Sequence, residues 1–246
     1  MEEGRIDFNV KIAGIVAGIR CRYQENCDFF YSYVTGEPEA FRIEATEEDQ
    51  AFSRELLRKF VGERADLYSD SYLENISLMN VLSRKLLDFN VLLIHGSALC
   101  MDGQAYIFVA PSGTGKSTHT RFWRETFGNR VQMINDDKPL VRIENGKAVV
   151  YGSPWDGKHH LSNNISAPLR AIVSLNRDTE NRIEPMPGAD VFPVMMRQTA
   201  WSRTGDLKLK VIGLERALME AAAFYKLGCN MDPDAARVAW EGMQPV

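Results

Sequence analysis

Apolar and polar residues alternate close to the start of the chain, where single polar residues separate Phe8, Val10 and Ile12. A period of two predicts a β-strand that buries one face. A second apolar run spans residues 15–19, and glycines punctuate both runs. The pattern predicts a small antiparallel sheet within residues 5–45.

Two amphipathic helices are predicted next, each opened by a capping box in which a hydroxyl residue precedes an acidic residue by three positions. The box at residues 46–49 opens a helix to about residue 61, and the box at residues 71–74 opens a helix to about residue 89. The residues expected to form their buried stripes are Phe52, Leu56 and Phe60 in the first helix, and Ile76, Met79, Leu82, Leu86 and Phe89 in the second.

Short apolar runs separated by turn residues indicate a different region from Val91 onward. Asp102-Gly103 and Asn145-Gly146 are typical of hairpin turns, so we expect a mixed sheet and not a plain doubly wound one. The predicted class is α/β with an α+β tendency. The expected strands cover residues 91–94, 98–101, 106–109, 131–134, 140–143, 147–151, 169–175 and 224–230, and the expected later helices cover residues 188–201, 207–223 and 233–242.

The chain is organised around residues 105–127, where an apolar strand enters the loop Ala-Pro-Ser-Gly-Thr-Gly-Lys-Ser and a helix leaves it and ends at Gly128. This order is that of a phosphate-binding loop. Its glycines let backbone N–H groups turn towards phosphate oxygens, and the helix start adds a partial positive charge. Lys116 is expected to reach the β- and γ-phosphates, and the Ser117 hydroxyl to ligate Mg²⁺. The residues expected to contact nucleotide are Ser112, Gly113, Thr114, Gly115, Lys116, Ser117 and Thr118.

One position departs from the usual phosphate-loop pattern, because Ala110 stands where the first glycine is expected. An alanine fits this position if its φ angle is negative. We therefore retain the phosphate-loop interpretation.

Composition narrows the class of protein. The 246 residues are 45% hydrophobic and 25% charged with a net charge of −4, which gives no basic face for nucleic acid. The four cysteines lack C-x-x-C spacing, which argues against a zinc site or a disulfide framework. No apolar run is long enough to cross a bilayer, and the N-terminus lacks a signal-peptide pattern. We expect a cytoplasmic protein without membrane or nucleic-acid partners.

Two adjacent carboxylates, Asp136 and Asp137, follow the first strand after the loop helix. A phosphate-loop enzyme needs a carboxylate here for Mg²⁺, and a second can accept the proton of an attacking hydroxyl. Adjacent residues of a strand point to opposite faces, so both can serve one site only if the strand has already ended. Asp136 is the predicted base and Asp137 the predicted metal ligand, and the two roles can be exchanged.

Other polar residues are candidates for the same site. His95 follows a short apolar strand and is placed to donate to phosphate or to pair with the aspartates. The polar loop that contains Trp155, Lys158 and His159 can contact a substrate or nucleotide. His119 is expected to be a surface or packing residue. Three basic residues that can reach phosphates from the C-terminal helices are Arg197, Arg203 and Lys208.

Together, His95-Gly96, the loop Ser112-Gly-Thr-Gly-Lys-Ser117 and Asp136-Asp137 resemble the catalytic domain of the HPr kinase/phosphorylase family of bacterial serine kinases. That domain is similar to the nucleotide-binding domain of phosphoenolpyruvate carboxykinase. The resemblance covers residues 91–175. It implies ATP, Mg²⁺ and transfer of a phosphoryl group to a hydroxyl, with an aspartate as base. It divides the chain into an N-terminal region, residues 1–90, and a catalytic domain, residues 91–246.

The acceptor implied by the resemblance is a serine-type hydroxyl of a protein or peptide, and the hexameric HPr kinases imply a homo-oligomer. Residues 152–160, Gly-Ser-Pro-Trp-Asp-Gly-Lys-His-His, replace the family segment that serves phosphorolysis, which argues against phosphorylase activity and against HPr as acceptor. The alternatives are a kinase for free serine or another small molecule, a non-catalytic ATP-binding regulatory module, and a simple nucleotide hydrolase.

Overall fold

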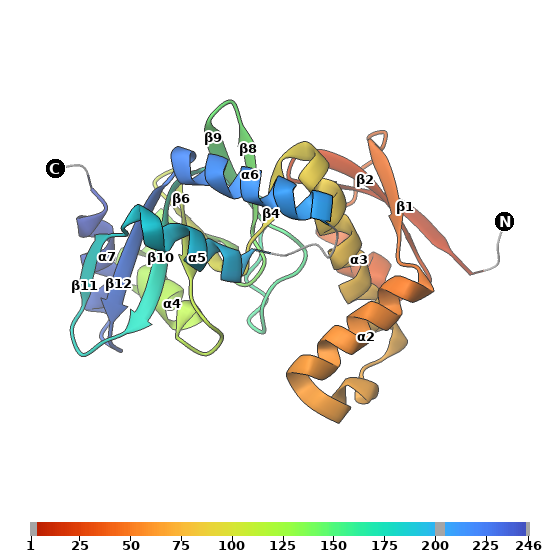
Figure 1. The fold of residues 1–246 in the computed structure, drawn as a ribbon, viewed down its shortest axis with the longest axis horizontal. Helices are drawn as coiled ribbons and strands as arrows, with labels where there is room; N and C mark the ends of the chain where they lie inside the picture. Colours follow the sequence, from red (N-terminus) through yellow and green to blue (C-terminus); the bar gives the residue numbers. More distant parts are fainter. Residues whose placement is uncertain (1–3, 200–204, 245–246) are drawn as a thin grey trace. The chain divides into compact units, whose positions relative to one another are not determined.

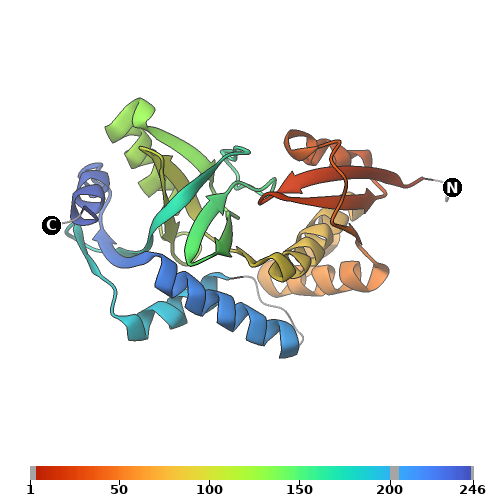
Figure 2. The same ribbon diagram turned by 90° about the horizontal axis from the view of Figure 1, so that it is seen from above.

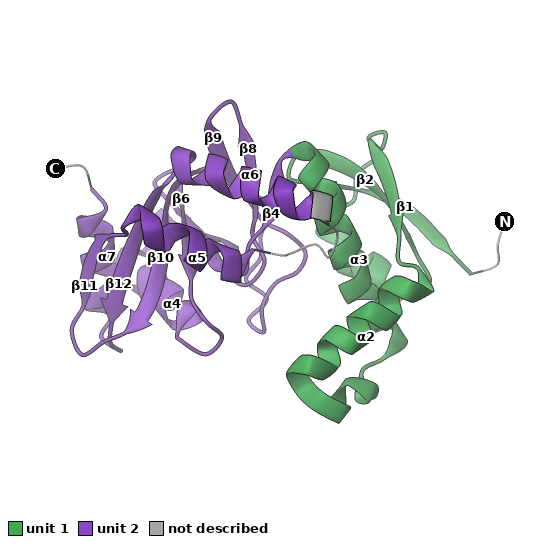
Figure 3. Ribbon diagram, viewed as in Figure 1, with its two compact units in different colours: residues 1–89 green, residues 90–246 purple. Residues whose placement is uncertain are grey.

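The structure is a computed structural model that describes residues 4–199 and 205–244. The chain forms two compact units, residues 1–89 and residues 90–246 (Figure 3). Each unit has its own sheet. The described residues contain no helix long and apolar enough to cross a membrane.

The sheet of the first unit has three strands, β1 (Ile6–Ile12), β2 (Ile15–Cys21) and β3 (Phe41–Glu44). β1 and β2 form the expected antiparallel hairpin, but β3 runs parallel to β2, so the prediction of a purely antiparallel sheet is wrong. The reason is the connection between β2 and β3, which contains the helix α1 (Gln24–Phe29) and the short 3₁₀ helix η1 (Tyr31–Tyr33). A crossover of this kind returns the chain in the same direction.

The helix α2 (Glu47–Val61) begins with the predicted capping box. Thr46 Oγ1 accepts from the Asp49 backbone N–H, and the Asp49 carboxylate accepts from Thr46 N in return. The predicted stripe is wrong at Phe60, whose side chain is exposed, and Phe52 and Leu56 are only partly buried. A 3₁₀ segment, η2 (Gly62–Leu67), follows α2.

The helix α3 (Asp70–Leu86) begins two residues earlier than the capping-box pattern indicated, because Ser69 is its N-cap and accepts from Tyr72 N. Glu74 cannot complete a box at Ser71, since its buried carboxylate accepts from Arg22 N and Asn26 Nδ2. The 3₁₀ segment η3 (Leu87–Phe89) ends the unit. Of the residues predicted for the buried stripe, Leu82 and Leu86 are buried, whereas Ile76, Met79 and Phe89 are partly buried.

The second unit contains a nine-stranded mixed sheet (Figure 1). Its longest strand, β10, pairs with β9 through residues 166–168 and with β6 and β12 through its later residues. The mixed sheet and its flanking helices confirm the predicted α/β class. The strands are β4 (Val91–Leu93), β5 (Ser97–Met101), β6 (Gln104–Val109), β7 (Val131–Asn135), β8 (Leu140–Glu144), β9 (Lys147–Tyr151), β10 (Ser166–Arg177), β11 (Arg182–Pro185) and β12 (Ala223–Cys229).

Both predicted hairpins are present. Asp102 and Gly103 join β5 to β6 with φ angles of 51° and 77°, and Asn145 and Gly146 join β8 to β9 with φ angles of 52° and 71°. Two successive residues at positive φ make the turn that matches the twist of antiparallel strands. The local sequence therefore fixes the register of both pairs.

The direction of the strands gathers several chain segments at one edge of the sheet. β6, β10 and β12 are parallel, and β7 points the same way because β5 runs antiparallel to both β6 and β7. The carboxyl ends of β6, β7, β10 and β12 therefore meet at one edge. β5 runs in the opposite direction, so the residues that precede it, His95 and Gly96, lie at this edge too. Ligands of open α/β sheets bind at such an edge.

Helices cover both faces of this sheet. Figure 2 shows α4 (Lys116–Phe127) on the opposite side of the strands from α5 (Gly188–Gln198) and α6 (Gly205–Ala221). The last helix, α7 (Asp234–Gly242), packs beside α4, with the rings of Phe127 and Trp240 5.7 Å apart. The helix predicted over residues 188–201 ends at Gln198, and Trp201 lies outside the described residues.

The core beneath α4 is aromatic. Phe108 on β6 and Trp123 on α4 are fully buried, with ring centroids 5.5 Å apart. Truncating aromatic residues of this kind to alanine typically costs about 3–5 kcal/mol. The packing holds α4, which follows the phosphate loop, against β6.

Candidate functional site

The loop between β6 and α4 has the backbone that the sequence predicts. Gly113 and Gly115 have φ angles of 77° and 125°, which other residues rarely adopt. Ala110 is buried and does not have a positive φ angle, so alanine fits the position of the first glycine without strain. Lys116 Nζ donates to the Ala110 carbonyl oxygen at 3.0 Å.

The electrostatic environment of Lys116 suits an anion. Burial lowers the pKa of its ammonium group below the usual value and Lys138 adds to this effect, while the nearby Asp137 opposes it. A partly desolvated ammonium gains more from a phosphate than a fully hydrated one does, because screening by water is weaker. Helix α4 begins at Lys116, so its partial positive charge acts on the same spot.

Asn135 shapes the turn that carries the two aspartates. β7 ends at Asn135, whose Oδ1 accepts from the backbone N–H groups of Asp137 at 2.8 Å and Lys138 at 2.6 Å. This side-chain turn ends the strand before Asp136. The condition under which both aspartates can serve one site is therefore met.

Asp136 is almost fully buried, at 4% relative exposure. Its Oδ1 accepts from the Gly157 backbone N–H at 2.7 Å, and its own carbonyl oxygen accepts from Ser97 Oγ at 2.9 Å. Its Oδ2 is buried and has no hydrogen-bond partner among the described residues. An unsatisfied buried carboxylate oxygen is costly, and it indicates a place for a proton donor or a cation.

Asp137 is more exposed and has two basic side chains as neighbours. His95 Nε2 lies 3.3 Å from Asp137 Oδ1, and Lys138 Nζ donates to Asp137 Oδ2 at 2.8 Å. Burial alone raises the pKa of Asp137, but the His95 and Lys138 interactions outweigh it and lower this pKa to about 2. Asp137 is therefore ionised throughout the neutral range.

The loop of residues 152–165 folds against this turn. Asn135 Nδ2 donates to the carbonyl oxygens of Ser153 and Trp155 at 3.0 and 3.2 Å, and Ser153 Oγ donates to the Lys138 carbonyl oxygen at 2.7 Å. A Cβ atom at Gly157 would lie 2.9 Å from Asp136 Oδ2. The loop thus approaches Asp136 so closely that only glycine fits without displacement.

Most of the predicted site residues line one cavity of about 540 Å³, which we call the phosphate cavity. It brings together the phosphate loop, the aspartates, His95 and part of the 152–165 loop. Its lining residues include His95, Ser112, Gly113, Gly115, Lys116, Ser117, Thr118, Asp136, Asp137, Gly157, Lys158 and His159.

Other predicted residues lie elsewhere. Thr114 lines two cavities adjacent to the phosphate cavity. Trp155 is buried at 7% exposure, which leaves little of its ring to stack on a ligand. His119 is buried, as expected for packing, and accepts from Trp123 Nε1 at 3.0 Å.

The three basic residues predicted to reach phosphates lie away from the phosphate cavity or outside the described residues. Arg197 lines a cavity beside α5, Lys208 is exposed on α6, and Arg203 lies outside the described residues.

Two residues of the site, Asn135 and Gly157, were not predicted as functional. Asn135 belongs to the same turn sequence as the aspartates, and an Asn before two acidic residues at a strand end is a signal for a side-chain turn. Gly157 gave no signal, because its importance depends on a contact with Asp136, 21 residues away.

The donor set fits Mg²⁺, which prefers oxygen ligands and is usually held in nucleotide sites by one or two carboxylates together with phosphates. Asp136 Oδ2 is a buried oxygen without a partner within the described chain, and Ser117 and Asp137 line the same cavity. Residues 4–199 and 205–244 contain no cluster of three or more His, Cys, Asp or Glu side chains able to hold a metal ion. A magnesium ion shared with phosphates does not need such a cluster.

No protein-family model matches the sequence. No curated protein matches it either. Among solved structures, the chain is similar to a protein described as the Hpr(Ser) kinase/phosphatase from Coxiella burnetii, with 14% sequence identity and a TM-score of 0.28. The match covers 50% of this chain and 93% of the other. At this identity and TM-score the similarity is one of structure only, and we base no functional conclusion on it.

Proposed function

We propose that this protein is an ATP-dependent kinase that transfers the γ-phosphate, with Mg²⁺, to a serine-type hydroxyl of a protein or peptide. The observation that carries the proposal is Asp136. Its Oδ1 is fixed by Gly157, while its buried Oδ2 has no partner among the described residues and the residue lines the same cavity as Lys116 and Ser117. A nucleotide switch needs a single carboxylate for Mg²⁺, whereas phosphoryl transfer to a hydroxyl also needs a proton acceptor, and the adjacent aspartates can supply both.

In the proposed mechanism, the backbone N–H groups of residues 112–117 and Lys116 hold the β- and γ-phosphates. Ser117 and Asp137 would hold Mg²⁺, which would neutralise charge on the phosphates. Asp136 accepts the proton of the acceptor hydroxyl. His95, whose Nε2 lies 3.3 Å from Asp137 Oδ1, orients the transferring group. Catalysis then consists mainly of positioning and electrostatic stabilisation.

The proposal is tested by following labelled γ-phosphate from ATP into serine-containing peptides, with ATP binding measured in parallel. Asp136→Asn is expected to bind ATP normally and to reduce transfer by about 10²–10⁴-fold, the usual contribution of a general base. Lys116→Ala is expected to weaken ATP binding as well. Asp102→Asn is the matched control, because Asp102 lies in an exposed hairpin turn where it pairs with Arg130.

Near-normal transfer by Asp136→Asn contradicts the assignment of the base. ATP binding without transfer to any hydroxyl supports the alternative, a regulatory ATP-binding module. ATP hydrolysis that no acceptor stimulates supports a simple nucleotide hydrolase.

A further inference from the structure

A second cavity, of about 400 Å³, lies on the α5 side of the sheet, and we call it the α5 cavity. Ala110 and Pro111 of the phosphate loop form part of its wall, so it borders the loop at its first residues. The ends of β6 and β10, the strand β12 and the helix α5 form the rest. The lining residues used in the argument are Asp190, Arg197, Gln198 and Lys226.

The charges of the α5 cavity favour an anion. Lys226 Nζ and Asp190 Oδ2 form an ion pair at 2.5 Å, in which the two charges offset each other. Arg197 adds a further positive charge to the lining. A guanidinium group suits a carboxylate because it can donate two parallel hydrogen bonds.

Gln198 supplies an independent indication of a ligand. Its side chain lines the α5 cavity and is only 7% exposed, yet its Oε1 has no hydrogen-bond partner among the described residues. A buried amide oxygen of this kind calls for a donor. A ligand that carries an N–H or O–H group can satisfy it.

The α5 cavity is connected to the proposed catalytic residues through the backbone. The Gln198 carbonyl oxygen accepts from His95 N at 2.6 Å, and Thr199 forms a β-bridge with Ile94. His95 in turn contacts Asp137. A ligand bound against Gln198 therefore lies next to the segment that positions His95.

A third cavity, of about 490 Å³, has a size and lining that suit a nucleoside. It lies beside the start of α4 and the ends of β10 and β12, and its lining includes the apolar side chains of Phe122 and Met231. In-line transfer requires the acceptor to approach from the side opposite to the leaving diphosphate. With the nucleoside in this apolar cavity, the charged α5 cavity is left for the acceptor.

We propose that the α5 cavity binds a carboxylate-bearing part of the acceptor. Arg197 holds the carboxylate, and Gln198 Oε1 accepts from a neighbouring N–H or O–H of the same molecule. The carboxylate comes from a free hydroxy amino acid or from an acidic residue near the target serine of a peptide. This inference rests on the proposed kinase function and names the chemistry of its acceptor.

The transfer step balances in atoms and electrons. The acceptor oxygen forms a bond to the γ-phosphorus, and the bond from that phosphorus to the β–γ bridging oxygen breaks. The electron pair leaves with ADP, and the hydroxyl proton goes to Asp136. The residues of the α5 cavity take no part in these bond changes.

The test compares matched acceptors that differ only in the carboxylate, using the full chain, ATP and Mg²⁺. One pair is L-serine and L-serine amide; the other is a set of serine peptides with glutamate near the serine and the same peptides with glutamine. At least one carboxylate member is expected to be phosphorylated about tenfold more efficiently than its neutral partner, a typical effect of one charge-assisted contact. If the carboxylate is preferred in the L-serine pair, it comes from a free amino acid. If it is preferred in the peptide pair, it comes from an acidic residue near the serine.

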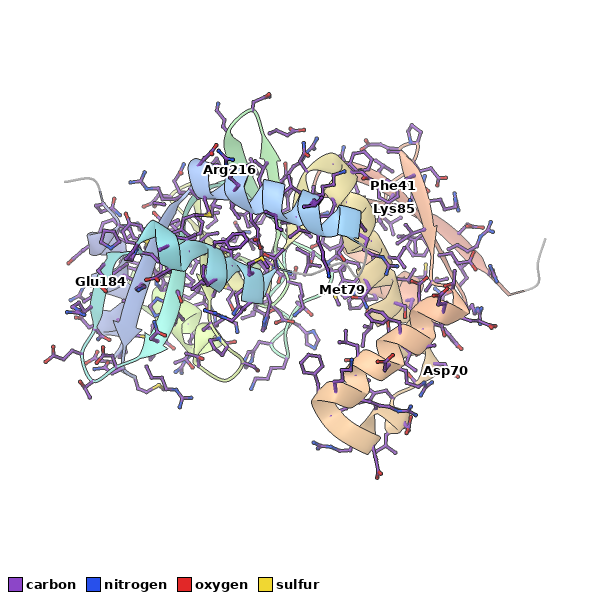
Figure 4. The ribbon with its side chains drawn as sticks, in the orientation of Figure 1. Phe41, Asp70, Met79, Lys85, Glu184 and Arg216 are labelled. Atoms are coloured by element: carbon purple, nitrogen blue, oxygen red, sulfur yellow. The ribbon has the colours of Figure 1, made fainter. Side chains whose placement is uncertain are left out.

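Reversing the charge of Arg197 tests whether the preference for a carboxylate arises in the α5 cavity. Arg197→Glu is expected to raise the KM of the carboxylate acceptor about tenfold or more, with the KM of ATP nearly unchanged. The control is Arg216→Glu, at a residue whose side chain is 83% exposed on α6 (Figure 4), which should leave both constants unchanged.

The outcomes separate the two proposals. ATP-dependent labelling of neutral and carboxylate acceptors at equal rates, or an unchanged acceptor KM in Arg197→Glu, overturns the assignment of the α5 cavity and leaves the kinase function intact. Labelling of neutral acceptors alone overturns it too. Failure to bind ATP, or ATP binding with no transfer to any acceptor, overturns the kinase function and the cavity assignment with it.

Discussion

The Gly157 backbone N–H donates to Asp136 Oδ1 at 2.7 Å, and the space beside this contact leaves no room for a side chain. The contact ties the 152–165 loop to the proposed base. It fixes one carboxylate oxygen and leaves Oδ2 buried without a partner among the described residues. The position of this proton acceptor therefore depends on a residue that has no reactive group.

Gly157→Ala is expected to impair transfer more than folding. The new Cβ would lie 2.9 Å from Asp136 Oδ2, so the carboxylate has to move. A displacement of about 1 Å in a reacting group can cost about 10²-fold in rate. Transfer should fall by this order while ATP binding stays normal, measured by labelled phosphate transfer and by nucleotide titration.

Gly213→Ala is the matched control, because a Cβ at Gly213 on α6 meets no atom within 4 Å. It should leave transfer unchanged, and a glycine-to-alanine change inside a helix typically stabilises by about 0.5–1 kcal/mol. Equal activity of the two variants would show that Gly157 does not position Asp136.

Features set by neighbouring residues could be predicted from the sequence, and features set by distant contacts could not. Asp102-Gly103 and the Thr46 capping box act within a few residues, and both have the predicted geometry. The start of α3 was misplaced because Glu74 bonds to Asn26, 48 residues away. The predicted buried position of Phe60 failed for a related reason, since helical period alone does not say whether another element covers that end of α2.

The same distinction holds for the candidate site. The phosphate loop and the aspartate pair are local motifs, and the structure brings them into one cavity. Asn135 joins that turn to the 152–165 loop through hydrogen bonds that reach as far as Ser162, 27 residues on. Trp155 was expected at the site because it lies in a polar loop, but the bonds from Asn135 to this loop hold it where the Trp155 ring is buried.

Asn135→Ala is expected to destabilise the second unit and to reduce transfer per folded molecule. The change removes the acceptor of two backbone N–H groups and the donor to the Ser153 and Trp155 carbonyl oxygens. Each buried group left without a partner costs about 1–3 kcal/mol. Denaturant unfolding measures the stability, and kcat measured at a known folded fraction gives the effect on transfer.

Leu227→Ala is the control that distinguishes a loss of stability from a loss of phosphoryl transfer. Leu227 is fully buried in the core of the same unit, and a leucine-to-alanine change there costs about 2–5 kcal/mol. This control should lose stability and keep its kcat per folded molecule. If both variants keep kcat, Asn135 contributes to stability alone.

Protonation of Asp137 should make the protein less stable at low pH. Its pKa in the folded protein is about 2, below the value near 3.8 of the free side chain. The lowered pKa stabilises the fold above about pH 4, and this contribution is lost as the pH falls towards 2. Because the side chain is 31% exposed, screening reduces the effect to about 1–2 kcal/mol.

The measurement compares the wild type with Asp137→Asn, using the free energy of unfolding at several pH values between 5 and 2. The wild type should lose about 1–2 kcal/mol more than the variant over this range. Parallel curves for the two proteins would mean that His95 and Lys138 do not lower the pKa of Asp137.

His119 should add a second pH dependence, in a milder range. Burial lowers its pKa to about 3, and its Nε2 accepts from Trp123 Nε1, so the neutral ring is the form that packs against Phe108. In the unfolded chain a histidine takes up a proton near pH 6.5. The folded state is therefore favoured fully above that pH and loses stability as the pH falls from 6.5 towards 3, by about 1.4 kcal/mol per pH unit.

His119→Gln cannot titrate and keeps an acceptor for Trp123. Between pH 6.5 and 4.5 the wild type should lose about 2 kcal/mol relative to this variant, measured by denaturant unfolding. Equal losses in the two proteins would mean that burial does not lower the pKa of His119 in the folded protein.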